Sequence, residues 1–192
     1  MLDIKVTENY GGIEVKGDYA DFEQLYDSIF EIIGDEEDYP TLEKLRIQIL
    51  AFCYDLRHAK QGNREIELVE NNMNDEIMKW HSIITPINNV YYKFKYILTQ
   101  AIFVVYSLNI FIDNYKYKKY KSSYYTKVVY DEAVNIVQEF QSKVIKAIVQ
   151  ILSEKNKKIF LKLFYDREFG TNRLVHQYLE LIDCRYLAKN KE

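Results

Sequence analysis

The chain has 192 residues, of which 48% are hydrophobic, a formal net charge of −3 and two cysteines. This composition can supply one sizeable core, and it argues against a disulfide scaffold and against an overall attraction to nucleic acid or anionic membranes. The first ten residues, MLDIKVTENY, lack the basic and apolar regions of a secretion signal. We therefore expect a cytoplasmic protein with free thiols.

The N-terminal residues predict a β-hairpin followed by a helix. Apolar and charged residues alternate in residues 2–6 and 13–15, on either side of a turn-rich segment. Asp18 or Asp21 can cap the helix that follows, and Gly34 can end it. The acidic run at residues 35–38 lacks the spacing of a calcium loop and is expected to be a solvated loop.

A second helix is expected between Thr41, as its cap, and Gly62. Apolar residues on both of its sides, Ile47 and Tyr54 among them, predict that it is covered on both sides.

The end of this second helix carries a polar cluster, Asp55, Arg57 and His58. These residues could form an acid–base site, because Asp55 and His58 can share one helix face. Basic side chains in a last helical turn also complement the helix dipole, and we favour this structural interpretation.

Two further strands and a short helix follow. Residues 64–70 and 90–96 alternate in polarity, the second most clearly, with Val90 and Phe94 on its inner side. Between them, Asn74 can cap a short helix that Pro86 ends.

Residues 96–112, YILTQAIFVVYSLNIFI, are the most apolar window and predict a buried central helix. The length approaches that of a membrane span, but Gln100 and Asn109 would lack partners in hydrocarbon. We favour the core helix, in which both amides must be hydrogen-bonded.

Lysines are interleaved with tyrosines in the segment 116–127, which contains Lys116, Tyr117, Lys118, Lys119, Tyr120 and Lys121. Lysines and aromatic rings together can bind single-stranded nucleic acid. The alternative is a basic surface on an extended helix, which the acidic balance of the whole chain favours.

The remaining sequence predicts helices only. A long apolar stripe begins near Val129, and two shorter helices follow on either side of Gly170. Asp166, Glu168 and His176 lie near their junction, where they could form an acid–base site or an ion-pair network.

Several short motifs resemble a family of small bacterial proteins known as a domain of unknown function. The motifs are Asn9-Tyr10-x-Gly12, Gly17-Asp18-Tyr19-x-Asp21, Leu25-Tyr26-Asp27, residues 53–59, and Asn89-Val90-Tyr91-Tyr92-x-Phe94. The resemblance covers about residues 2–115 and implies a bacterial, cytoplasmic protein. It supplies no catalytic or binding residues.

The sequence contains no phosphate-binding glycine loop and no GxSxG, HExxH or CxxC motif, and its three histidines, His58, His81 and His176, lie far apart in the sequence. We therefore expect no cofactor and no metal, and we lean away from an enzyme.

We predict a single α+β domain, residues 1–192, that is mostly helical. A small antiparallel sheet with the N-terminal hairpin packs on a helical bundle, with an α+β part in residues 1–115 and a helical part in residues 124–192. The function favoured is a non-enzymatic interaction protein, a homo-oligomer or a member of a regulatory or defence complex. Nucleic-acid binding and an assembled acid–base site are the alternatives.

Overall fold

The structure is a computed structural model that describes residues 2–121, 131–163 and 173–189. Its elements are β1 (Asp3–Val6), β2 (Gly12–Gly17), α1 (Tyr19–Ile33), η1 (Pro40–Leu42), α2 (Glu43–Lys60), β3 (Glu65–Glu70), α3 (Asp75–His81), β4 (Asn88–Ile97), α4 (Leu98–Tyr120), α5 (Glu132–Ile151), α6 (Glu154–Leu163) and α7 (Arg173–Lys189). The predicted class is confirmed: the fold is α+β, mostly helical, with a small antiparallel sheet that starts with a hairpin.

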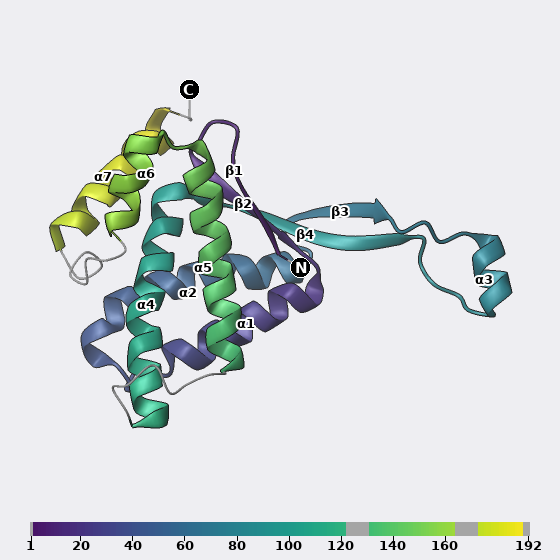
Figure 1. Cartoon of the computed structure of the whole chain (residues 1–192), viewed down its shortest axis with the longest axis horizontal. Helices are drawn as coiled ribbons and strands as arrows, with labels where there is room; N and C mark the ends of the chain where they lie inside the picture. Colours follow the sequence, from purple (N-terminus) through teal and green to yellow (C-terminus); the bar gives the residue numbers. More distant parts are fainter. Residues whose placement is uncertain (1, 122–130, 164–172, 190–192) are drawn as a thin grey trace.

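The sheet has four antiparallel strands in the order β1-β2-β4-β3 (Figure 1). Val15 is in register with Ile4 on one side and Phe94 on the other, and all three are buried. Lys5 and Lys95 alternate with these residues and are exposed on the opposite face. The period of two in the sequence therefore separates a core face from a charged face.

Phe52 of α2 lies where the sheet and the helices meet. Its ring centroid is 5.6 Å from that of Phe94, 5.2 Å from that of Tyr96 and 5.1 Å from that of Phe140 in α5. One hydrophobic cluster consequently joins the sheet with α1, α2, α4 and α5.

The predicted central helix is confirmed as a buried element, α4, although its bounds differ. Pairing with Gly12 keeps Ile97 in β4, so α4 begins at Leu98 and continues to Tyr120. Asn109 accepts a 2.9 Å hydrogen bond from Gln141 of α5. Within the described ranges, no helix combines the length and the apolar character needed to cross a membrane.

The first helix matches its prediction. Asp18 accepts a 2.8 Å hydrogen bond from the backbone N–H of Asp21, whose carboxylate accepts one in return from the backbone of Asp18. Gly34 ends the helix with a positive φ. Both ends are set by local chemistry, which is why the sequence shows them.

Two predictions about α2 are wrong. Thr41 lies in the short helix η1, and Leu42 at the N-cap of α2 makes no side-chain cap. Ile47 and Tyr54 are 55% and 52% exposed, so the outer side of α2 faces solvent.

The short helix α3 also ends earlier than predicted, at Ser82 in the left-handed conformation.

A projecting arm is the most distinctive feature of the molecule (Figure 1). Strand β2 pairs with β4 over residues 92–97, whereas β3 pairs with β4 over residues 88–93. The outer half of β4 therefore continues past the rest of the sheet with β3 alone beside it, and α3 closes the far end. We call residues 65–91 the arm and the remainder of the chain the body.

Candidate interaction surface

In the body, helices cover one face of the sheet. The same face continues into the arm, where these helices no longer cover it. Val90, Tyr92 and Phe94 are every second residue of β4 and therefore lie on the same side of the strand. Phe94 is nevertheless 2% exposed, whereas Val90 is 41% exposed. The prediction that Val90 faces inward is therefore wrong. Ile66 and Leu68 lie opposite Tyr92 and Val90 and are 52% and 63% exposed. A face with the sequence pattern of a buried strand is thus left uncovered.

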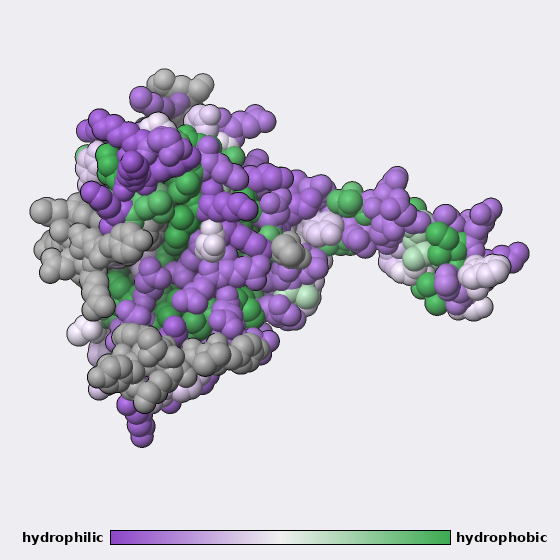
Figure 2. All heavy atoms as spheres, in the orientation of Figure 1, coloured by the Kyte–Doolittle hydropathy of each residue, from purple (hydrophilic) through white to green (hydrophobic). Residues whose placement is uncertain are grey.

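The tip of the arm adds a second set of exposed apolar side chains. Trp80 is 85% exposed and Ile84 is fully exposed; Ile77, Ile83 and Ile87 are exposed as well. Figure 2 shows hydrophobic residues gathered at this tip, away from the body. Concentrations of large apolar side chains on a projection are typical of interaction sites.

Hydrogen bonds give the tip a defined backbone. The side chain of Asn71 donates to the carbonyl of Pro86 at 3.0 Å, and Asn74 caps α3 by accepting from the N–H of Ile77 at 3.0 Å. The N–H of Ile83 donates to the carbonyl of Met78 at 3.0 Å and closes the helix. The apolar side chains of the tip are therefore carried by a backbone that local hydrogen bonds hold in place.

Ion pairs fix the root of the arm to the body. Glu67 lies 2.9 Å from Lys16 and 3.0 Å from Lys93, and Arg64 lies 2.7 Å from Asp55 of α2. Hydrogen bonds from the two lysines hold the pKa of Glu67 below its usual range. This network fixes the direction in which the arm leaves the body.

The predicted polar cluster at the end of α2 lies beside this root, and its members have separate contacts. Asp55 pairs with Arg64, and His58 Nδ1 lies 3.2 Å from the side-chain nitrogen of Asn63. The Arg57 guanidinium lies 5.7 Å from the ring centroid of Tyr54. These contacts support a structural role at the arm root.

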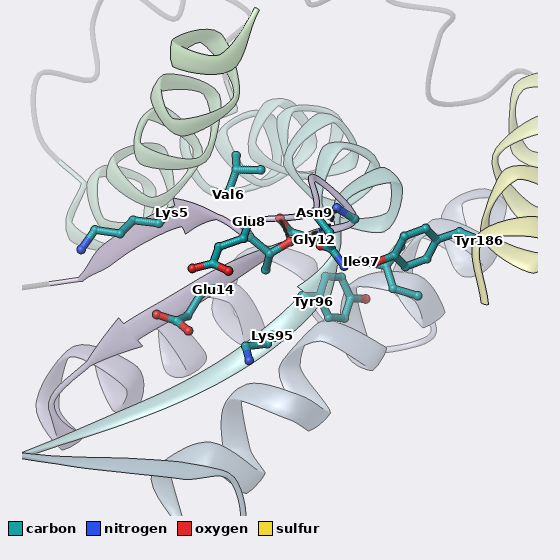
Figure 3. A pocket seen from close by; sticks show the side chains of 12 residues that line it. Lys5, Val6, Glu8, Asn9, Gly12, Glu14, Lys95, Tyr96, Ile97 and Tyr186 are labelled. Carbon is teal, nitrogen blue, oxygen red and sulfur yellow. Dashed lines mark hydrogen bonds between the residues drawn. The ribbon is translucent and has the colours of Figure 1, made fainter. Parts of the chain in front are cut away.

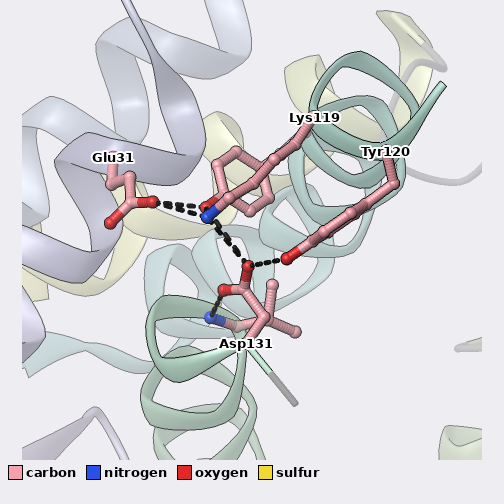
Figure 4. Close-up of polar contacts among 6 residues, drawn as sticks. Glu31, Lys119, Tyr120 and Asp131 are labelled. Atoms are coloured by element: carbon pink, nitrogen blue, oxygen red, sulfur yellow. Dashed lines mark hydrogen bonds and ion pairs between the residues drawn. The ribbon is translucent and has the colours of Figure 1, made fainter. Parts of the chain in front are cut away.

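The lysine–tyrosine segment forms the end of α4, and part of its charge is neutralised. Lys118 is 2.5 Å from Asp38, in the acidic run, and Lys119 contacts Glu31 at 3.1 Å and Asp131 at 3.0 Å (Figure 4). Tyr117 is exposed, and so is Lys121 just past the helix, whereas Lys116 is half-buried. Residues 122–127 of the predicted segment lie outside the described residues.

Asp131 is the centre of a polar network that sequence reasoning missed. It is 6% exposed, caps α5 at the N–H of Val134 and accepts a 2.7 Å hydrogen bond from Tyr120 (Figure 4). Burial opposes its ionisation, but the hydrogen bonds from Tyr120, Val134 and Lys119 together hold its pKa below the usual value. The hydrogen bond with Tyr115, together with Asp131 and Glu31, raises the pKa of Lys119. The network links α1, α4 and α5 through ion pairs and hydrogen bonds.

A shallow cleft of about 740 Å³ lies where the N-terminal hairpin meets β4 and α7 (Figure 3). Lys5, Glu14 and Lys95 line it with alternating charge, and Tyr186 closes one end by accepting a 2.9 Å hydrogen bond from Asn9. Its charges alternate along the strands, so the cleft has no single electrostatic preference.

A groove of about 620 Å³ lies on the body between α4, α5 and α6. Its apolar lining comes from Val105, Ile145, Val149 and Leu161. Five polar residues line it as well: Asn109, Gln138, Gln141, Ser142 and Lys146. Figure 2 shows hydrophobic residues exposed in this part of the body, beside α6. Among the described residues, the groove and the arm therefore both expose apolar side chains.

The comparison with known families agrees with the resemblance in the sequence. The sequence matches the family described as domain of unknown function DUF6904 over residues 2–192. The chain belongs to the DUF6904 family. The match extends well past residue 115, where the resemblance in the motifs ended, so the C-terminal helices belong to the DUF6904 domain too. No curated protein and no solved structure matched the chain.

Within the described part of this DUF6904 chain, no group of three or more His, Cys, Asp or Glu side chains has an arrangement suited to a metal ion. The predicted junction cluster cannot be placed in the same way, because Asp166 and Glu168 lie outside the described residues. The side chain of His176 lies outside them as well.

Sequence reasoning did not single out the residues that form the arm tip. Trp80, Ile83, Ile84 and Ile87 lie in a short stretch between two asparagine pairs, residues 71–72 and 88–89. Asparagines favour turns, as at residues 71–72, whereas Asn88 and Asn89 begin β4 and pair with β3. A run of apolar residues close to one predicted turn was therefore the available signal for the exposed surface of this DUF6904 chain.

Proposed function

We propose that this protein works by binding another protein and that the arm is its contact surface. The observation that supports the proposal best is the uncovered apolar side of β3 and β4, together with the exposed Trp80 and Ile84 at the tip. Fully burying one large apolar side chain is worth about 1.5–3 kcal/mol. Several such side chains on an ordered projection could supply the central part of an interface, where tryptophan is enriched.

The contacts of the polar side chains also favour binding over catalysis. Asp55 and His58 each contact a different neighbour, and Lys118 and Lys119 are engaged by carboxylates. The support for nucleic-acid binding by the lysine–tyrosine segment is weaker for the same reason. Lysines that are already paired with carboxylates neutralise fewer phosphates and so release fewer counterions from a nucleic acid. We place the activity in the bacterial cytoplasm, in a regulatory or defence complex, which suits free cysteines and an acidic chain.

A photocrosslinking amino acid at position 80 tests the proposal in cells. The same group at position 47, on the exposed side of α2, is the matched control, because Ile47 is also well exposed. We expect protein adducts from position 80 that survive nuclease and that position 47 does not give. Equal adduct patterns at the two positions, or none at position 80, would contradict the proposal.

A further inference from the structure

We propose that the binding partner of the arm is a second copy of this chain, and that the arm tip of each copy occupies the groove between α4, α5 and α6 of the other. This inference rests on the proposed function, since it requires the arm to be a contact surface. It assigns the occupant of the groove and the symmetry of the assembly.

The two surfaces are complementary in charge. The outer arm carries Glu70, Asp75 and Glu76 against a single lysine, Lys79. Lys146 is one of the residues that line the groove. Helix α6, which forms one wall, adds exposed lysines at positions 155, 158 and 162. An acidic apolar tip therefore faces a basic apolar receptor, which favours the correct orientation on encounter.

The sizes of the surfaces also agree. The groove of about 620 Å³ is open to solvent, so it offers the Trp80 side chain and a neighbouring isoleucine an apolar surface on which to lie. A two-fold exchange forms the contact twice, so each tip and groove need to bury only about 600–1,000 Å² to give the roughly 1,200–2,000 Å² of stable interfaces.

One chain cannot make this contact with itself. Figure 1 shows the tip of the arm at one end of the long axis, with α6 and α7 toward the other end. The pairs of Glu67 with Lys16 and Lys93 hold the arm in that direction. A second molecule is therefore required to bring a tip to a groove.

Pairing of β3 with β3 of another copy is the other way to use the arm, and its sequence opposes it. Strand β3 lies at the edge of the sheet with Glu65, Glu67 and Glu70 along it. Lysines pair with Glu65 and Glu67, so an added strand would have to fit beside three ion pairs, and charged residues along an edge are a common means of preventing edge-to-edge association. Exchange between tip and groove does not involve that edge.

Sedimentation equilibrium with two complementary variants tests the exchange. The arm variant Trp80→Asp/Ile84→Asp destroys the tip and leaves the groove, and the groove variant Lys146→Glu/Leu161→Asp does the reverse. All four positions are exposed, and circular dichroism verifies that both variants fold. The control Ile47→Asp/Tyr54→Asp changes exposed residues of α2 instead.

We expect the wild type and the control to be dimers, and each variant alone to dissociate with a dimer Kd raised about 30-fold or more, as loss of central interface residues does. An equimolar mixture of the two variants should recover a heterodimer, because one intact tip still meets one intact groove. A monomeric wild type, an arm variant that stays dimeric, or a mixture without heterodimer overturns the inference. If the wild type is monomeric while position 80 still crosslinks to a different protein, the exchange is wrong and the proposed function stands.

Discussion

Asp183 of α7 accepts a 2.5 Å hydrogen bond from the side-chain amide of Gln100 in the first turn of α4, and a second hydrogen bond from the hydroxyl of Thr99. Asp183 is 7% exposed, and Ile97 at the N-cap of α4 provides no side-chain cap. The carboxylate therefore lies close to the positive end of the α4 dipole. A residue near the C-terminus thus attaches α7 to the central helix.

Replacing this carboxylate should loosen α7. We expect Asp183→Ala to lower the free energy of unfolding by about 1–3 kcal/mol, because it leaves the polar groups of Thr99 and Gln100 without their partner. Urea unfolding followed by circular dichroism measures the change. Glu180→Gln, an exposed position on the same helix, is the control and should change stability little. Equal unfolding midpoints for both variants would contradict the assigned role.

The network around Asp131 should make stability depend on acid pH. Because the pKa of Asp131 is lowered on folding, its contribution is complete above the ordinary value of 3.8 and is lost as the pH falls through the lower folded value. Asp131→Asn keeps a residue that can cap α5 but removes the charge, so it should cost about 1.5–3 kcal/mol at pH 7 and less at pH 3, which lies below the ordinary pKa of 3.8. Urea titrations at the two pH values measure this difference, with exposed Glu132→Gln as the neighbour control. A cost that is the same at both values would contradict the assignment.

Gly12 should not tolerate a side chain. A Cβ at this position would lie 2.6 Å from the backbone carbonyl oxygen of Tyr96, which the sheet holds in place. We expect Gly12→Ala to destabilise the protein by about 1–3 kcal/mol in thermal or urea unfolding, as other forced contacts in packed structure do.

The neighbouring glycine provides a matched comparison. A Cβ at Gly11 would overlap the ring of Tyr186, a side chain. The cost of Gly11→Ala should therefore disappear in a Tyr186→Ala background, whereas the cost of Gly12→Ala should persist there. The opposite pattern would show that the two contacts have been assigned incorrectly.

The two cysteines should differ sharply in reactivity. Cys53 is buried in α2, which raises the pKa of its thiol to about 12, whereas Cys184 is exposed on α7. At pH 8 a disulfide reagent should therefore modify one thiol quickly in the native protein and the second only after unfolding. Cys184→Ser should abolish the fast reaction. Two fast equivalents in the wild type would contradict the burial of Cys53.

The sequence was informative where a structure depends on neighbouring residues. Asp18, Gly34 and Asn74 set the ends of their helices through contacts within a few residues, and all three were predicted. The exception is Thr41: after Pro40 the chain forms a tight turn of 3-10 helix, so the residue lies before α2 instead of capping it. Contacts between polar residues that lie far apart in the chain, such as Lys119 and Glu31, could not be predicted from the sequence.

Coverage of an apolar face was not predictable. Val90 and Phe94 occupy equivalent positions in one alternating pattern, yet only Phe94 is buried. The difference depends on where the packed helices end in space, which no local pattern records. The same limit explains Ile47 and Tyr54 on α2 and the exposed surface of the arm.

The order of strands in the sheet has a consequence for the newly made chain. Strand β4 must be inserted between β2 and β3, so the sheet stays incomplete until residue 97 has left the ribosome. By then α1 and α2 have already been synthesised, but Phe22 and Phe52 still lack Phe94, the ring that both contact in the folded protein. Closing a connection of this length is slow compared with forming a hairpin. The nascent protein therefore passes through a stage in which the N-terminal hairpin lacks its β4 neighbour and the apolar faces of α1 and α2 are partly exposed. A chaperone would be of most use to the chain at this stage.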